Sequence, residues 1–208
     1  MSRLLMVRHG ETAHNAGGRL STAAPGGPLN ERGLAQAEAL ATRLAGAPLA
    51  AVYTSPLLRA RQTAASIAAP HGLRPRRRDD LAEIGAGELE GRADEGAFAV
   101  LNRALDAWCR GEYGARIGRD GDAGTEVCER FGRVVAEVSA RHPCLPVALV
   151  SHGGLLQVGV SWLAENLPPG FALRRFIGNA GVVELEVTAG GTRCLSWEGV
   201  RPTVLMAR

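Results

Sequence analysis

The sequence predicts one α/β domain, a three-layer α/β/α sandwich with a mostly parallel sheet and an antiparallel strand at one edge. Short apolar runs alternate with amphipathic helical segments along most of the 208 residues, as in strands joined by crossover helices. Near the C-terminus, an alternating run followed by two glycines is typical of an antiparallel hairpin. We expect a single domain over residues 1–208, with a lid or insertion at about residues 85–124.

The first third of the chain predicts two strands with a helix between them. The apolar run LLMV at residues 4–7 is typical of a strand covered on both faces, and AAVYTS at residues 50–55 is typical of a second short strand. The helix between them is expected to begin after Asn30 as N-cap and to stop at Gly46. Its apolar residues recur at helical spacing, at Leu34, Ala37, Ala41 and Leu44.

A second helix and a less regular segment follow. The helix is expected over residues 55–69, with Ser55 at its cap and Pro56 at its first helical position. Residues 85–124 then hold many glycines and charges, with one helical candidate at about residues 98–108. This change of pattern is the reason to expect a lid or insertion there.

The remaining third predicts a helix, a strand, a helix and a hairpin. The first helix is expected over residues 125–140, the apolar strand VALVS at residues 147–151, and the second helix from the following glycines through Trp162. Residues 182–187 (VVELEV) then alternate between apolar and acidic side chains, which is typical of a strand with one buried face. The chain thus repeats the strand, turn, helix order of its beginning.

Composition argues against a dedicated nucleic-acid binder. The 24 basic residues nearly balance 21 acidic ones, giving a formal net charge of +3. All 24 are arginines, which either suits bidentate contacts to anions or reflects a GC-rich genome. The local run RPRRR at residues 74–78 is followed by two aspartates, so we expect a solvated face there rather than a site for an acidic partner.

Cysteine spacing and hydropathy predict a cytoplasmic protein. The four cysteines form no CxxC pair and show no metal-ligand spacing, so we expect reduced thiols. The N-terminal residues do not resemble a signal peptide, and no segment approaches the ~20 apolar residues that cross a membrane.

Basic side chains follow two of the predicted strands. His9 comes directly after Arg8 at the end of the first strand, and His152 follows the strand VALVS. Ligands of such sheets bind outside the carboxyl ends of the strands, and Arg59 in the first turn of the second helix is expected at the same edge. Four clustered basic side chains repel one another unless they bind an anion. These residues therefore predict a site for a phosphoryl group.

The same residues lie in motifs that resemble a known family. RHGETAHN, SPLLRARQTA, LAEIGAGELEG and VSHGG occur in the order and spacing of the histidine phosphatase superfamily, also called phosphoglycerate-mutase-like, and IGNAGV resembles its closing segment. The resemblance implies a phosphohistidine mechanism. It makes His9 the nucleophile and Glu83 the proton donor, has Arg8, Arg59 and His152 cradle the phosphoryl group, and adds Asn15 as a further phosphate contact.

Several further features of the site are expected. A cationic pocket disfavours protonation of His9, which leaves the imidazole able to attack phosphorus near neutral pH. Gly10 and Gly153 allow their backbone to approach the phosphate, and Ser21 and Thr22 stand where relatives often have Gln and Gly, so we expect them in the substrate and phosphate site. Neither a metal nor another cofactor is expected, because arginines meet the charge that magnesium meets elsewhere.

Cofactor-dependent mutases of this family carry a longer insertion and aromatic-rich loops. The resemblance, with the short EIGAGELEG segment and an aromatic content of 4%, therefore implies a hydrolase of a small phosphorylated metabolite. Two alternatives remain open, namely phosphoryl transfer of the phosphoglycerate mutase type and a phospho-ligand binding module without turnover. A homodimer through the edge hairpin is also possible. Trp108 is expected in the core rather than against substrate, and His14 at the surface or pocket rim.

Overall fold

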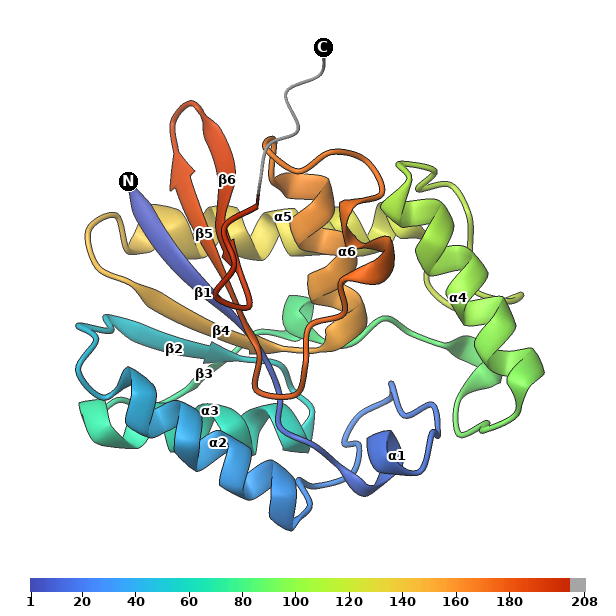
Figure 1. Ribbon diagram of the computed structural model, residues 1–208, viewed down its shortest axis with the longest axis horizontal. Helices are drawn as coiled ribbons and strands as arrows, with labels where there is room; N and C mark the ends of the chain where they lie inside the picture. Colours follow the sequence, from blue (N-terminus) through green and yellow to red (C-terminus); the bar gives the residue numbers. More distant parts are fainter. Residues whose placement is uncertain (203–208) are drawn as a thin grey trace.

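The computed structural model describes residues 1–202, with the backbone alone at residue 174. Six strands form one sheet in the order β3, β2, β4, β1, β5, β6 (Figure 1). Their bounds are β1 Ser2–Arg8, β2 Ala51–Thr54, β3 Arg76–Arg77, β4 Val147–Ser151, β5 Val182–Thr188 and β6 Gly191–Trp197. The pairs among β1 to β4 are parallel, whereas β5 and β6 are antiparallel. The predicted fold is confirmed, and the predicted hairpin forms the two antiparallel strands β5 and β6 at one edge of the sheet.

Helices cover both faces of the sheet. Figure 1 shows α2 and α3 on one face and α5 and α6 on the other, with α4 beside α6. The bounds are α1 Ala13–Ala16, α2 Glu31–Leu44, α3 Leu58–Ala68, α4 Glu95–Cys109, α5 Gly124–Arg141 and α6 Gly153–Leu163. Short 3₁₀ helices lie at Ala69–His71, Asp79–Leu81, Gly87–Leu89 and Phe171–Arg174.

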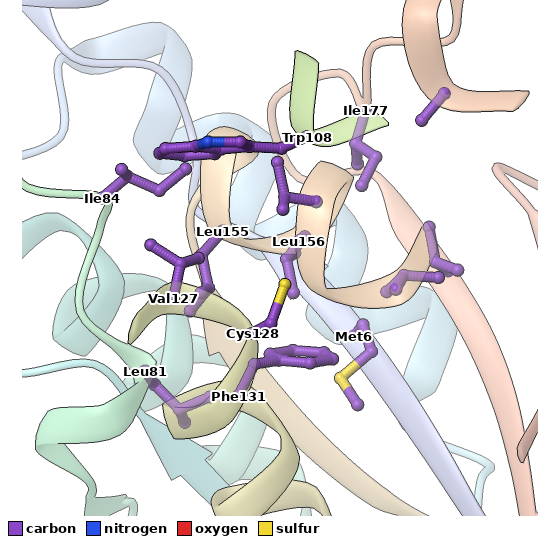
Figure 2. Close-up of a cluster of buried hydrophobic side chains, with 14 of the residues drawn as sticks. Met6, Leu81, Ile84, Trp108, Val127, Cys128, Phe131, Leu155, Leu156 and Ile177 are labelled. Carbon is purple, nitrogen blue, oxygen red and sulfur yellow. The ribbon is translucent and has the colours of Figure 1, made fainter. Parts of the chain in front are cut away.

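Alternate residues of β1 enter two separate cores. Leu4 and Met6 pack in the cluster under α5 and α6, whereas Leu5 and Val7 pack in the cluster under α2 and α3. Figure 2 shows part of the first cluster, including Met6 and Phe131. Burial on both faces explains why a strand at the centre of a parallel sheet is a continuous apolar run.

The central strands end side by side. β1 pairs with β4 in parallel, so that Arg8 lies opposite Ser151. His9 directly follows Arg8, and His152 directly follows Ser151. The two histidines therefore lie at the same edge of the sheet.

Two details of the predicted helices are wrong. α3 begins at Leu58 and not at Pro56, and the Ser55 hydroxyl accepts only the amide of Leu57 there (3.2 Å). In α2, Leu34 is 42% exposed, and the buried face consists of Gly33, Ala37, Leu40 and Ala41. Gly33 belongs to that face because a side chain there would collide with the backbone of Glu11. The predicted N-cap is confirmed, since the Asn30 side chain accepts the amide of Gly33 (2.8 Å).

The segment at 85–124 contains α4 and two loops. Trp108 on α4 is fully buried and donates its indole N–H to the Ala115 carbonyl (2.9 Å), which confirms it as a core residue. Opening of this segment as a lid stays a prediction. β6 forms one edge of the sheet, and a homodimer through that edge likewise stays a prediction.

Within residues 1–202, no helix combines the length and the apolar character that a membrane crossing demands. The four cysteines are free thiols. Cys109, Cys128 and Cys194 are buried, and Cys144 is exposed. A cytoplasmic location stays a prediction.

Candidate active site

The imidazole of His9 lies at the end of β1 and is almost fully buried. Its Nδ1 is 2.6 Å from the Gly10 carbonyl oxygen, and the Nε of Arg59 donates to its Nε2 (2.9 Å). A carbonyl can only accept and a guanidinium can only donate, so the proton of the neutral ring is on Nδ1. Nε2 therefore has its lone pair facing Arg59.

The surroundings of His9 keep this ring neutral. Burial, and after it the positive charge of Arg59, lower the pKa of His9 from 6.5 to about 3. The hydrogen bond to Gly10 opposes this shift, and Arg8 adds to it. Near neutral pH the ring is thus an unprotonated base and a potential nucleophile.

Two arginines bring positive charge to the same place. Arg59 donates from Nη2 to the Ser21 carbonyl (2.9 Å), and Arg8 donates from Nη1 to the Ile177 carbonyl (2.7 Å). Burial lowers the pKa of both guanidinium groups, and the charge of Glu83 partly opposes this. The Nε of Arg8 is buried without a partner among the described residues. A buried donor of this kind is typical of a site that receives an anion.

His152 stands beside His9, with the two ring centroids 5.1 Å apart. It is fully buried, and its Nε2 is 2.7 Å from the hydroxyl of Ser55. A hydroxyl has one hydrogen and two lone pairs, so that of Ser55 can donate to Nε2 while it accepts the Leu57 amide. In that arrangement the proton of a neutral His152 is on Nδ1, which is buried and finds no partner in the part of the chain that the structure describes. Burial, followed by the charges of His9 and Arg59, lowers the pKa of His152 well below its usual value.

Glu83 is held at the N-terminus of α6. Its Oε1 accepts hydrogen bonds from the amides of Leu155 (3.0 Å) and Ile84 (2.9 Å). Its Oε2 accepts one from the amide of Gly154 (3.3 Å). Arg130 holds the backbone at residues 82–83 by donating to the carbonyls of Ala82 (2.7 Å) and Glu83 (3.1 Å). The carboxyl group therefore has a defined position on the wall of the site.

A cavity of about 310 Å³ opens onto these groups. The predicted site residues that line it are Arg8, His9, Asn15, Ser21, Thr22, Arg59, Glu83 and Gly153. His152 is not among them, since it lies buried next to His9. His14 also lines the cavity and is partly exposed, as expected of a residue at the rim.

Two groups that were expected to contact the phosphate are hydrogen-bonded to other parts of the protein. The Gly10 amide does not face the cavity, because it donates to the Thr63 hydroxyl (3.1 Å), and Gly10 is required by its close contact with the Gly33 backbone. The hydroxyl of Thr22 donates to Glu90 (2.5 Å), so Thr22 has no free hydroxyl hydrogen for a phosphate. Thr22 instead links the loop after α1 to the segment at 85–124.

Several residues of the site have no separate prediction from the sequence. Ser55 is expected only as a helix cap, although its hydroxyl contacts Nε2 of the buried His152. Further lining residues, on α4, α6 and the loop before β5, are Phe98, Leu101, Asn102, Leu105, Gln157, Phe176 and Ile177. The spacing of residues 98, 101 and 105 is a signal for one helix face, but not for what that face contacts. Within residues 1–202, His, Cys, Asp and Glu side chains form no group of three or more that could hold a metal ion.

Comparison with known proteins places this arrangement in context. Residues 4–199 match the family model described as histidine phosphatase superfamily (branch 1). The adenosylcobalamin/alpha-ribazole phosphatase of Salmonella typhimurium is 32% identical over 161 residues, which cover 77% of this chain and 79% of that protein. The metal-independent phosphoserine phosphatase of Arabidopsis thaliana is 32% identical over 162 residues, which cover 76% and 66% of the two chains.

Solved structures show the same fold. A mycobacterial glucosyl-3-phosphoglycerate phosphatase in complex with VO3 superposes with a TM-score of 0.82 and 30% identity, over 95% of this chain and 99% of that one. YhfR of Bacillus stearothermophilus superposes with a TM-score of 0.81 and 26% identity, over 97% and 98% of the two chains.

Proposed function

The chain belongs to the histidine phosphatase superfamily, and from this premise we propose that it hydrolyses a small phosphate monoester through a phosphohistidine on Nε2 of His9. Its relatives are phosphatases, which supports a phosphomonoesterase. The observation that carries the proposal is the unprotonated Nε2 of a buried His9, held by Arg59 beside the cavity.

In the first step, the lone pair of His9 Nε2 attacks phosphorus and the bond from phosphorus to the ester oxygen breaks. Glu83 gives a proton to the leaving oxygen, so that an alcohol departs and not an alkoxide. The proton of His9 stays on Nδ1 and is donated to the Gly10 carbonyl, a hydrogen bond that holds the ring in line as it becomes positively charged.

In the second step, water attacks the phosphorus of the phosphohistidine. Glu83 accepts a proton from that water, the bond between nitrogen and phosphorus breaks, and its electron pair returns to Nε2. Inorganic phosphate leaves, and His9 is again neutral.

Charge on the phosphoryl oxygens is met by fixed donors. The Nε of Arg8 and the guanidinium of Arg59 supply side-chain donors, and the amide of Gly153 at the start of α6 adds a backbone donor. His152 does not line the cavity but is proposed as a further donor, because its ring lies beside that of His9 and its buried Nδ1 has no partner among the described residues. Fixed donors of this type each contribute about 3 to 4 kcal/mol to transition-state stabilisation. Asn15 and Ser21 are proposed as further contacts, and the reaction as written uses no metal or other cofactor.

The test is to capture the intermediate. Protein mixed with a ³²P-labelled phosphate monoester and quenched within a turnover is expected to retain acid-labile, base-stable label on His9, together with steady release of inorganic phosphate. His9→Asn should lose both, whereas His71→Asn, in the 3₁₀ helix Ala69–His71, should keep both.

Two further assays separate the alternatives. Tight phosphate binding without turnover would favour a binding module. Conversion of 3-phosphoglycerate to 2-phosphoglycerate in the presence of 2,3-bisphosphoglycerate would favour a mutase, in which the phosphoryl group returns to a second hydroxyl and no phosphate is released.

A further inference from the structure

One wall of the cavity is an apolar face of α4. Phe98, Leu101 and Leu105 are spaced as neighbours along one side of this helix, and all three line the cavity. Ala97, Ala104 and Trp108 lie on the adjoining part of the same apolar face and are buried in the core. Leu105 also belongs to this core, whereas Phe98 and Leu101 are only partly buried and pack at its edge, where they line the cavity.

Other segments complete this apolar surface. Leu20, Ile84 and Ile177 line the cavity from three separate parts of the chain. Phe176 lines it as well, although 67% of its surface is exposed to solvent. A large aromatic side chain left exposed at a cavity gains stability only when something apolar covers it.

The charged side chains of the cavity are concentrated at the end near His9, where the phosphoryl group is proposed to bind. Among the described lining residues, Glu83 is the only carboxylate, and its oxygens already accept three backbone amides. The one lining arginine besides Arg8 and Arg59 is Arg19, which is exposed and donates to the Gly91 carbonyl. Nothing in this described lining offers a free anion to an ammonium group or a cluster of cations to a second phosphate.

We propose that the natural substrate is a phosphate monoester of an uncharged alcohol bearing an aromatic or branched apolar group, which packs between α4 and Phe176. This inference rests on the proposed hydrolase function. The phosphoryl group occupies the site of His9, Arg8 and Arg59, and the apolar group contacts Phe98, Leu101 and Phe176.

The proposal also predicts which esters are poor substrates. An amino-acid ester such as O-phosphoserine places an ammonium and a carboxylate against apolar side chains, where both lose hydration. The ammonium has no matching partner in the described lining, and the lining cation outside the phosphoryl site, Arg19, is exposed and already donates to the Gly91 carbonyl. A substrate with a carboxylate next to the ester, such as 3-phosphoglycerate, meets the same difficulty. A site of this kind discriminates by leaving charges unpaired as much as by apolar contact.

The experiment compares kcat/KM for 2-phenylethyl phosphate, ethyl phosphate, O-phosphoserine and 3-phosphoglycerate, measured by phosphate release. The first two esters release alcohols of similar acidity, so their ratio reports binding of the phenyl group and not leaving-group chemistry. Burial of the ring is expected to favour 2-phenylethyl phosphate about tenfold to a hundredfold, with the two charged esters at or below ethyl phosphate.

Leu101→Asn tests whether α4 is the surface responsible. The substitution keeps the size of the side chain but removes its apolar character, and it is expected to reduce the ratio of 2-phenylethyl to ethyl phosphate to about threefold or less. The ratio within one protein sample does not depend on how much of the sample is folded. Leu34→Asn, at an exposed position of α2, is the matched control and should leave the wild-type ratio.

The outcomes separate the two proposals. Three outcomes contradict the proposed apolar leaving group but not the phosphatase activity. They are a wild-type ratio near one, a preference for O-phosphoserine or 3-phosphoglycerate, and an unchanged ratio in Leu101→Asn. Release of phosphate from none of the four esters, and equally none from p-nitrophenyl phosphate, overturns the phosphatase and this inference with it.

Discussion

The Nε of Arg59 donates to Nε2 of His9 at 2.9 Å, so the atom proposed as nucleophile is hydrogen-bonded to a residue proposed to bind the phosphoryl group. The lone pair of Nε2 is occupied by this hydrogen bond. We therefore expect a bound phosphoryl group to compete for the Nε hydrogen of Arg59 and so to free Nε2 for attack.

Arg59→Met should lower kcat/KM about a hundredfold or more, because a donor to the phosphoryl group is lost. The pKa of His9 should rise from about 3, since the charge of Arg59 helps to lower it, but it should stay below 6.5 because burial is the larger cause. Steady-state kinetics and an NMR titration of the His9 ring measure the two effects. Arg61→Met, at an exposed position of the same helix, is the control.

The protein should lose stability as pH falls from about 7 to about 5. In this range the unfolded chain binds a proton at His9, whereas folded His9 stays neutral down to about pH 3. The unfolded state therefore binds more protons, and the free energy of unfolding should decrease by about 2 kcal/mol on account of His9. His152 acts in the same direction.

Urea unfolding across this range gives the slope. Asp94, Glu126 and Glu137 have lowered pKa values, so their contribution is lost only at more acidic pH, below the range used. His9→Asn should flatten the slope, and a wild-type protein equally stable at both ends would contradict a buried neutral His9.

Ser55→Ala should lower kcat about tenfold, because His152 loses the hydroxyl that keeps its proton on Nδ1. The unpaired Nε2 should also lower the free energy of unfolding by about 1 to 3 kcal/mol. Kinetics and urea unfolding are measured on the same samples. Ser66→Ala, on α3 and away from His152, should change neither value appreciably, and an equal loss of kcat in both variants would show that the effect is not specific to His152.

Glu83→Gln should slow hydrolysis of alkyl phosphates more than that of aryl phosphates, by about tenfold or more in the ratio. An alkoxide needs a proton to leave, whereas a nitrophenolate does not. Rates for ethyl phosphate and p-nitrophenyl phosphate give this ratio. Equal slowing of both esters would show that Glu83 is not the proton donor.

The order of strands and helices could be predicted because it depends on local patterns. The apolar run at residues 4–7 and the strand before His152 are buried on both faces, and parallel pairing brings their ends together without further information. Asn30 behaved as predicted because its cap interaction is with the neighbouring turn of the same helix.

The errors occurred where a distant contact determines the local structure. Ser55 does not cap α3 because the helix begins at Leu58, whose amide donates to the distant Pro25 carbonyl (2.8 Å). Gly10 was assigned to phosphate binding, whereas its amide is used by Thr63. The apolar face of α4 runs without a break from the core to the cavity, so its spacing alone does not show which of its residues line the cavity.

The close contact between Gly10 and Gly33 has a consequence for catalysis. A side chain at either glycine would force α2 away from the loop that follows His9. With glycine at both positions, α2 packs directly against the loop that follows His9. We expect this packing to restrict the loop, so that the proposed attack on phosphorus needs no search over loop conformations.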